Sequence, residues 1–141
     1  MSAYNKFNIF VQDITQKVHN LSSDALKVAL SNVAPVATNA VFADITEISA
    51  GNGYSAGGNT PSITSDVQTS GTLKLILAST VFTASGGSIG PLRYAVLYNS
   101  TPTTPLKPLI AWFDYGSSIT LLTGETLTIA FDGTNGTLTI A

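Results

Sequence analysis

The sequence predicts a mainly β fold, an antiparallel β-sandwich or jelly roll with an amphipathic helix at its N-terminus. From Asp24 onward, apolar residues recur mostly at every second position, which is the period of a half-buried strand. Turns rich in glycine and proline separate seven or eight such segments, at the spacing typical of sandwiches and jelly rolls. Strands do not alternate with long helical segments, which argues against a doubly wound parallel sheet.

The length and the composition point to one domain that is partly covered by other proteins. A chain of 141 residues suits a single core, which we divide into an N-terminal helix or arm (1–22) and a β-sandwich domain (23–141). Only 10% of the residues are charged, against roughly 25% in typical soluble domains. Because charge is depleted at the centres of protein interfaces, the composition predicts a surface covered by neighbours. The alternative is a polar but uncharged β protein that stands alone.

The N-terminal segment has the period of a helix. Residues 4–20 are expected to form it, because apolar residues recur there at three- and four-residue steps, at Phe7, Phe10, Val11, Ile14 and Val18. Polar residues occupy the other side, at Asn8, Gln12, Asp13, Gln16 and Lys17. The apolar stripe either packs against the core or docks onto a neighbouring subunit. The candidate residues for a protein interface are Phe7, Phe10, Ile14 and Tyr54.

The first half of the β region contains strands interrupted by loops. Residues 26–30 alternate as a strand, and Pro35 indicates a loop over 32–39. Residues 41–48 fit either a short strand or one helical turn, and we favour the strand. Four glycines within 51–58 supply positive φ angles for a long loop. A weak strand is expected after it, over 63–68.

The second half carries the strongest strand signals. A central strand is expected at 72–82, and further strands at 93–98, 109–115 and 119–122. The breaks between them contain glycine, proline or serine, at 86–91, 99–108 and 116–118. Residues 125–131 and 137–140 alternate strictly around D-G and N-G turn signals, which predicts a C-terminal hairpin.

No catalytic, metal or cofactor site is predicted. Residues 86–90 match the G-x-S-x-G nucleophile elbow, but a proline and a strand follow them. The only histidine, His19, lies far upstream, whereas that motif requires a downstream base. The glycine loop at 51–58 lacks the G-K-[ST] of a phosphate-binding loop. Cysteine is absent, so a cysteine-based zinc site is excluded.

Three partner classes are also not expected. No Lys/Arg cluster is present to follow nucleic-acid phosphates or an anionic membrane. A small-molecule substrate is not expected either.

A few residues could serve carbohydrate chemistry. Asp114, Glu125 and Asp132 are glycosidase candidates by residue type alone. The aromatic residues Trp112, Phe113 and Tyr115 could form a carbohydrate platform, although aromatics in such a strand more often fill a core.

Several segments resemble small structural proteins of tailed bacteriophages. The most specific element is the run T-E-I-S-x-G-x-G-Y-x-A-G-G, which spans 46–58. Residues 26–30, 94–99 and 112–117 are similar to the same group. This resemblance implies a virion component, made in the host cytoplasm. Cement and decoration proteins of this size are often jelly-roll-like.

The resemblance and the low charge together predict a non-enzymatic capsid cement or decoration protein. It is expected to sit on the capsid surface as a homo-oligomer, bound to the major capsid protein or to other virion proteins. The alternatives are a tail, collar or fibre-base component, and a carbohydrate-binding β-sandwich module.

Overall fold

The computed structural model describes residues 3–141 and is mainly β, with antiparallel sheets and one short N-terminal helix. The prediction of a mainly β, antiparallel fold is therefore confirmed. The elements are, in chain order, β1 (Asn5–Lys6), α1 (Ile9–Thr15), β2 (Leu26–Ser31), a 3₁₀ turn (Phe42–Asp44), β3 (Ile63–Thr69), β4 (Thr72–Leu77), β5 (Thr80–Thr83), β6 (Ile89–Asn99), β7 (Leu109–Leu121), β8 (Thr126–Ile129) and β9 (Leu138–Ile140).

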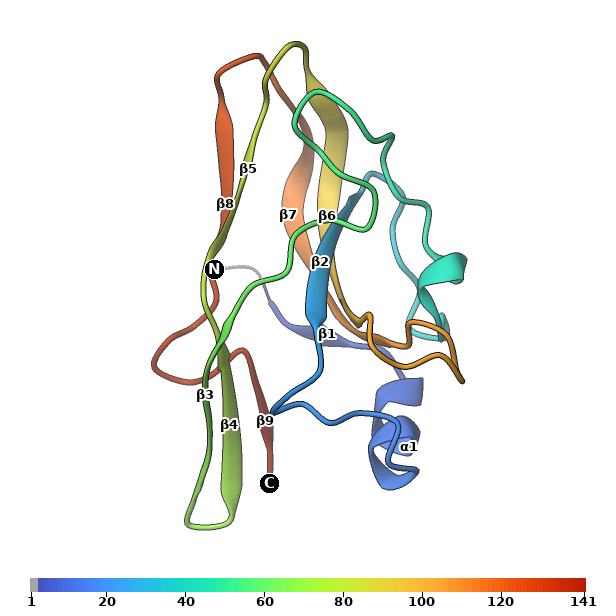
Figure 1. The fold of residues 1–141 in the computed structure, drawn as a ribbon, viewed down its shortest axis with the longest axis vertical. Coiled ribbons are helices and arrows are strands. Elements are labelled where there is room, and N and C mark those ends of the chain that lie inside the picture. The colour runs from blue at the N-terminus through green and yellow to red at the C-terminus, as the bar shows by residue number, and fades with distance from the viewer. Residues whose placement is uncertain (1–2) are drawn as a thin grey trace.

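The strands form three antiparallel sheets. The largest has the order β1-β7-β6-β2, and the smaller ones have the orders β3-β4-β9 and β5-β8. Only two residues separate β4 from β5, so the two small sheets follow one another along a single stretch of chain, as the green and yellow ribbon shows (Figure 1). The strand predicted over 72–82 is thus real but interrupted at Ala78 and Ser79.

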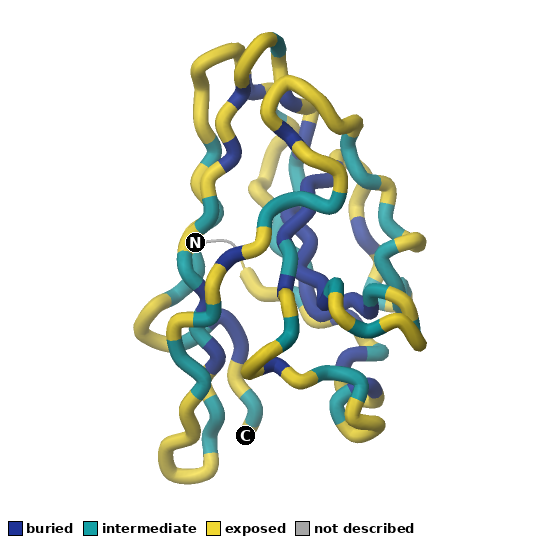
Figure 2. The backbone as a smooth tube through the Cα atoms, viewed as in Figure 1, coloured by how far each residue is buried: buried dark blue, intermediate teal, exposed yellow. Residues whose placement is uncertain are grey.

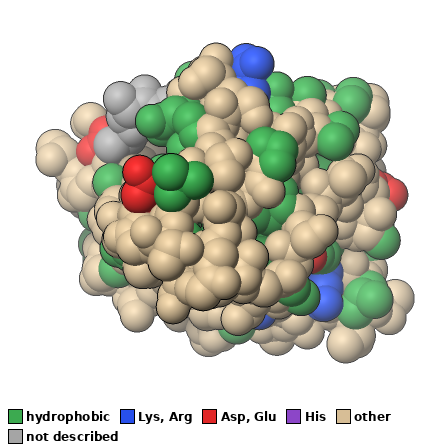
Figure 3. All heavy atoms as spheres, turned by 90° about the horizontal axis from the view of Figure 1, so that it is seen from above, with side chains coloured by type: hydrophobic (Ala, Val, Ile, Leu, Met, Phe, Trp, Pro, Cys, Tyr) green, Lys and Arg blue, Asp and Glu red, His purple; other side chains and the backbone are tan. Residues whose placement is uncertain are grey.

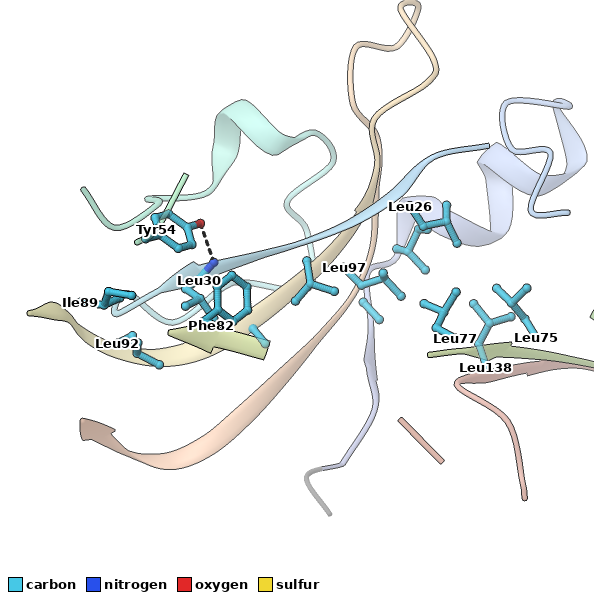
Figure 4. Packing of buried hydrophobic residues seen from close by; sticks show 14 of the residues in the cluster. Leu26, Leu30, Tyr54, Leu75, Leu77, Phe82, Ile89, Leu92, Leu97 and Leu138 are labelled. Carbon is cyan, nitrogen blue, oxygen red and sulfur yellow. Dashed lines mark hydrogen bonds between the residues drawn. The ribbon is translucent and has the colours of Figure 1, made fainter. Parts of the chain in front are cut away.

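The main core lies among the three sheets. Figure 2 shows the buried residues concentrated in the middle of the four-stranded sheet, and Figure 4 shows how they meet side chains of the smaller sheets. Its members include Leu26 and Leu30 from β2, Leu75 and Leu77 from β4, Phe82 from β5, Leu92 and Leu97 from β6, and Leu138 from β9. A smaller cluster, including Phe7, Val96 and Tyr98, lies apart from it. Two clusters arise because successive side chains of a strand point to opposite faces.

The helix is shorter than predicted. Asn5 and Lys6 pair with β7 as a strand, so the helix cannot begin at residue 4. It ends at Thr15, and Lys17 has a φ of 63°, the left-handed conformation that stops a helix. The predicted faces were also wrong at two positions, because Asp13 of the polar side is buried and Val11 of the apolar side is half exposed.

Two further predictions need correction. Residues 41–48 contain a 3₁₀ turn and not a strand, since the Asp44 carboxylate accepts hydrogen bonds from the backbone of Ala40 and Val41 and closes the turn. The predicted C-terminal hairpin is absent, because β8 pairs with β5 and β9 pairs with β4. The turn signals at 132–136 instead form a loop that carries the chain from one small sheet to the other.

The glycine-rich loop fastens the four-stranded sheet to β5. Asn59 exchanges two backbone hydrogen bonds with Val28 of β2, and its side chain donates to Thr80 and Val81 of β5. The buried Tyr54 hydroxyl accepts a hydrogen bond from the Leu30 N–H and donates one to the Glu47 carboxylate. The loop that carries the most specific motif of the sequence therefore holds β2 and β5 together, and we call its Tyr54 and Asn59 contacts the clamp. Figure 4 shows the hydrogen bond between Tyr54 and Leu30.

Candidate protein interface

Among the described residues 3–141, one strand edge of the four-stranded sheet is unpaired over most of its length. β1 pairs with β7 only at Ala111 and Trp112. Beyond Trp112, β7 continues through Leu121 with β6 on one side and, among residues 3–141, no strand on the other. Within the same described residues, β8 pairs only with β5. Two strands that follow one another in the chain thus each present a free edge.

A groove of about 830 Å³ lies beside these two strands. Its apolar floor comes from the four-stranded sheet, at Leu30, Leu92 and Ala95, and its opposite wall comes from β8 and the loop after it. Aromatic rings line the opening, at Tyr4, Tyr94, Phe113, Tyr115 and Phe131. The volume is within the range of ordinary ligand pockets.

The aromatic rings pack against one another across the groove. The centroid of the Phe113 ring lies 6.0 Å from that of Tyr4 and 5.9 Å from that of Phe131, both in edge-to-face geometry. These contacts tie β7 to the segment before β1 and to the loop after β8. Tyr115, by contrast, is 55% exposed and lies on the unpaired part of β7. It is the ring best placed to meet a partner.

The charges at the groove are neutralised within the chain. Arg93 Nε donates to Asp114 Oδ1 at 2.8 Å and Nη2 donates to Oδ2 at 3.0 Å, a bidentate pair. This pairing and the Gly116 N–H lower the pKa of Asp114. Asp132 is occupied by the backbone of Thr134 and Asn135. The groove therefore favours a partner surface without strong net charge.

The free part of β7 has few of the residues that usually protect a strand edge, although its register with β6 is irregular between Asp114 and Ile119, where Gly116 has a φ of 104°. Natural edges carry lysines, prolines or inward-pointing charges that prevent pairing with another chain. Residues 113–121 contain no lysine and no proline, and Asp114 is their only charged residue. Figure 3, a view from above, shows the same character on one face of the molecule, where uncharged tan and green atoms far outnumber blue and red ones. The edge therefore carries little charge that would oppose an added strand.

The structure corrects the predicted interface residues. Phe7, Phe10 and Tyr54 are buried in the chain's own core, with exposures of 0%, 4% and 2%. Ile14 is partly buried and packs against that core. None of the first three can contact a neighbour in this conformation, because burial inside the chain already satisfies their apolar surface. Phe7, Phe10 and Ile14 of the apolar stripe thus pack against the chain's own core, whereas Val11 is half exposed.

The other candidates from the sequence have local partners. The Trp112 ring lies 4.6 Å from that of Phe7, so it is packed and not a free platform. Asp132 lines the groove and Asp114 is paired with Arg93, whereas the Glu125 carboxylate closes its own turn by accepting from the Leu122 N–H. Tyr4 and Phe131 were missed as site residues. The lack of edge-protecting residues in 113–121 is the signal that could have located the site.

Neither a metal cluster nor a membrane-spanning helix occurs in the described part of the chain. Within residues 3–141, no group of three or more His, Cys, Asp or Glu side chains could hold a metal ion. Over the same residues, the helices are too short or too polar to cross a bilayer.

Comparisons with family models, with curated proteins and with solved structures found no match to this chain.

Proposed function

We propose that this chain is a non-enzymatic virion structural protein of a tailed phage, which binds the capsid shell as a cement or decoration protein. The resemblance of residues 46–58 to such proteins and the scarcity of charged residues support this function. The observation that carries the proposal is the unpaired, almost uncharged edge of β7 beside an aromatic groove.

In this proposal the three sheets act as an open, sandwich-like body that other chains complete. Strand addition supplies main-chain hydrogen bonds at the edge, and the groove supplies pockets for the side chains of the added strand. The partners are the major capsid protein and further copies of this chain. Apolar burial contributes about 25 cal/mol per Å² before the costs of association are subtracted.

A lysine placed on the β7 edge tests the interface. Tyr115→Lys is expected to weaken binding to purified capsid shells by roughly tenfold or more, because a strand-edge lysine must lose its hydration when another strand pairs there. Binding is measured by co-sedimentation with shells, and self-association by analytical ultracentrifugation. The matched control is Val36→Lys, since Val36 is 56% exposed in a loop away from the groove.

Wild-type binding by Tyr115→Lys, or an equal loss in both variants, would remove the β7 edge as the interface. The copy number in the particle separates the shell from the tail. A cement protein is present in hundreds of copies, whereas a ring component of the tail or collar is present in about a dozen, as its symmetry dictates.

A carbohydrate-binding function is the second candidate. The observation in its favour is that the exposed Tyr115 ring lies in the same groove as Arg93, so that a stacking face is near the guanidinium that pairs with Asp114. A glycan array with the wild type and with Tyr115→Ala decides it. Binding that is lost in the variant would favour this function over a purely structural one.

A further inference from the structure

Four polar side chains are packed together beneath α1. They are Asp13 on the helix, His19 and Asp24 on the loop that follows it, and Asn99 at the end of β6. The side chains of His19 and Asp13 are 0% and 4% exposed, and Asn99 is fully buried. The His19 ring also packs against Phe10 of α1, with 5.2 Å between the ring centroids.

The hydrogen bonds of Asn99 fix the protonation state of His19. Asn99 Oδ1 accepts from the Thr101 N–H at 3.1 Å, so the Nδ2 group must face the other way. It donates one hydrogen to Asp24 Oδ2 at 2.7 Å and directs the other at His19 Nδ1, 3.0 Å away. His19 Nδ1 therefore accepts a hydrogen bond. The ring is neutral and carries its proton on Nε2.

The other side of the ring is unsatisfied. His19 Nε2 and Asp13 Oδ2 are both buried, and neither has a hydrogen-bond partner among residues 3–141. They lie 3.9 Å apart, which is too far for a hydrogen bond. A buried carboxylate oxygen without a partner is costly, and such groups in native proteins call for an explanation.

We propose that this cluster is an acid-sensitive latch, in which protonation of His19 releases the segment 9–24 from the body of the protein. The inference is independent of the capsid function proposed above, because it concerns a different part of the molecule.

Protonation conflicts with the hydrogen bonds around the ring. An imidazolium has a hydrogen on Nδ1 as well, and that hydrogen would point at the Nδ2 donors of Asn99. Rotation of the Asn99 amide would relieve this contact, but it would place Oδ1 against the Asp24 carboxylate and Nδ2 against the Thr101 N–H. Each arrangement of the protonated ring thus leaves at least one buried polar group opposed by a like group.

Burial and the neighbouring charges favour opening of the latch at His19 and oppose it at Asp13 and Asp24. Burial lowers the pKa of His19 to about 4, and the Asp24 carboxylate partly offsets this. Burial raises the pKa of Asp13, so protonation of Asp13 favours the closed latch and opposes opening. Lys17 of the same segment and Asp66 of β3 line the pocket that contains His19 and Asp24, and they are the other charged groups that face it.

Opening would expose apolar surface. Phe10 and Leu21 belong to this segment and are buried in the main core, and the adjoining pocket is lined by Leu73 of β4 and Ile140 of β9. Release of residues 9–24 would therefore uncover β4 around Leu73 and β9 around Ile140. An acidic environment would give the protein a second apolar surface that it lacks at neutral pH.

Amide hydrogen exchange of residues 9–24 tests the latch. The pKa of His19 is about 4 in the closed state and takes the ordinary value of about 6.5 in the opened state. If only His19 titrates, the opened population should rise roughly fifty-fold between pH 7 and about pH 4.5. The protection factors, corrected for intrinsic exchange, should fall by this amount in Asp13→Asn and by somewhat less in the wild type. They should not fall in His19→Gln, whose neutral amide can accept from Asn99 at every pH.

The single histidine allows a second readout that needs no variant. NMR shifts of the His19 ring nitrogens should show the Nε2–H form at neutral pH and a titration midpoint near 4. An Nδ1–H form, a midpoint near the ordinary value of about 6.5, or equal acid opening in His19→Gln would each overturn the proposal. The ring titration decides the matter if His19→Gln does not fold.

Discussion

Gly58→Ala is expected to destabilise the protein by about 3 kcal/mol or more, a cost typical of a severe backbone clash. A Cβ atom at this position would overlap the Val28 carbonyl oxygen, which is backbone and cannot move aside. The φ angle of +77° adds strain for any residue with a side chain. The paired bonds between Val28 and Asn59 would have to separate. Chemical denaturation measures the loss.

The matched control is Gly71→Ala, at the turn between β3 and β4. Gly71 has a similar φ of +82°, but a Cβ atom added there would meet nothing within 4 Å. Its substitution should cost only the backbone strain, about 1 kcal/mol. Equal losses in the two variants would show that the close approach of the glycine loop to β2 is not what stabilises the clamp.

Tyr54→Ala is expected to lower the free energy of unfolding by about 4 kcal/mol, as for other large-to-small substitutions in a core. The ring is 2% exposed and packs against Phe82 of β5, 5.7 Å away between centroids. Its hydroxyl accepts the Leu30 N–H and donates to Glu47. Truncation would leave a cavity and a buried donor without an acceptor. Thermal and chemical unfolding measure the effect.

Tyr54→Phe separates the two contributions. It keeps the ring and removes only the hydroxyl, so about 1 to 3 kcal/mol should be lost, the cost of a buried group left unsatisfied. Tyr115→Phe is the control, because the Tyr115 side chain is exposed. An unchanged stability in Tyr54→Phe would mean that water replaces the hydroxyl and that the clamp rests on packing alone.

The strands were predictable where apolar segments stand between clear turn signals. Residues 26–30 and 93–98 are such segments, and both lie within observed strands, β2 and β6, which are largely buried on both faces. The C-terminal pairing was not predictable, because alternation fixes which face is buried but not which strand lies alongside. Leu127 and Leu138 point inward whether their strands pair with each other or with β5 and β4.

The site was harder to predict than the fold. An apolar stripe such as Phe7 and Phe10 has the same pattern whether it meets its own core or a neighbour, and only the structure shows that these rings are buried. Asp13 was placed on the polar face because a carboxylate is normally exposed. A free strand edge depends on how long the neighbouring strand is, and β1 has only two residues beside β7. The length of that pairing is a property of the whole sheet.

The pairing of β1 with β7 has a consequence for the synthesis of the chain. Asn5 lies opposite Trp112, and Leu26 of β2 lies opposite Asn99. Neither early strand can find its neighbour until the ribosome has made most of the protein. Contacts so distant along a chain slow folding and prolong the exposure of apolar segments. The newly made polypeptide should therefore depend on chaperones more than its small size suggests.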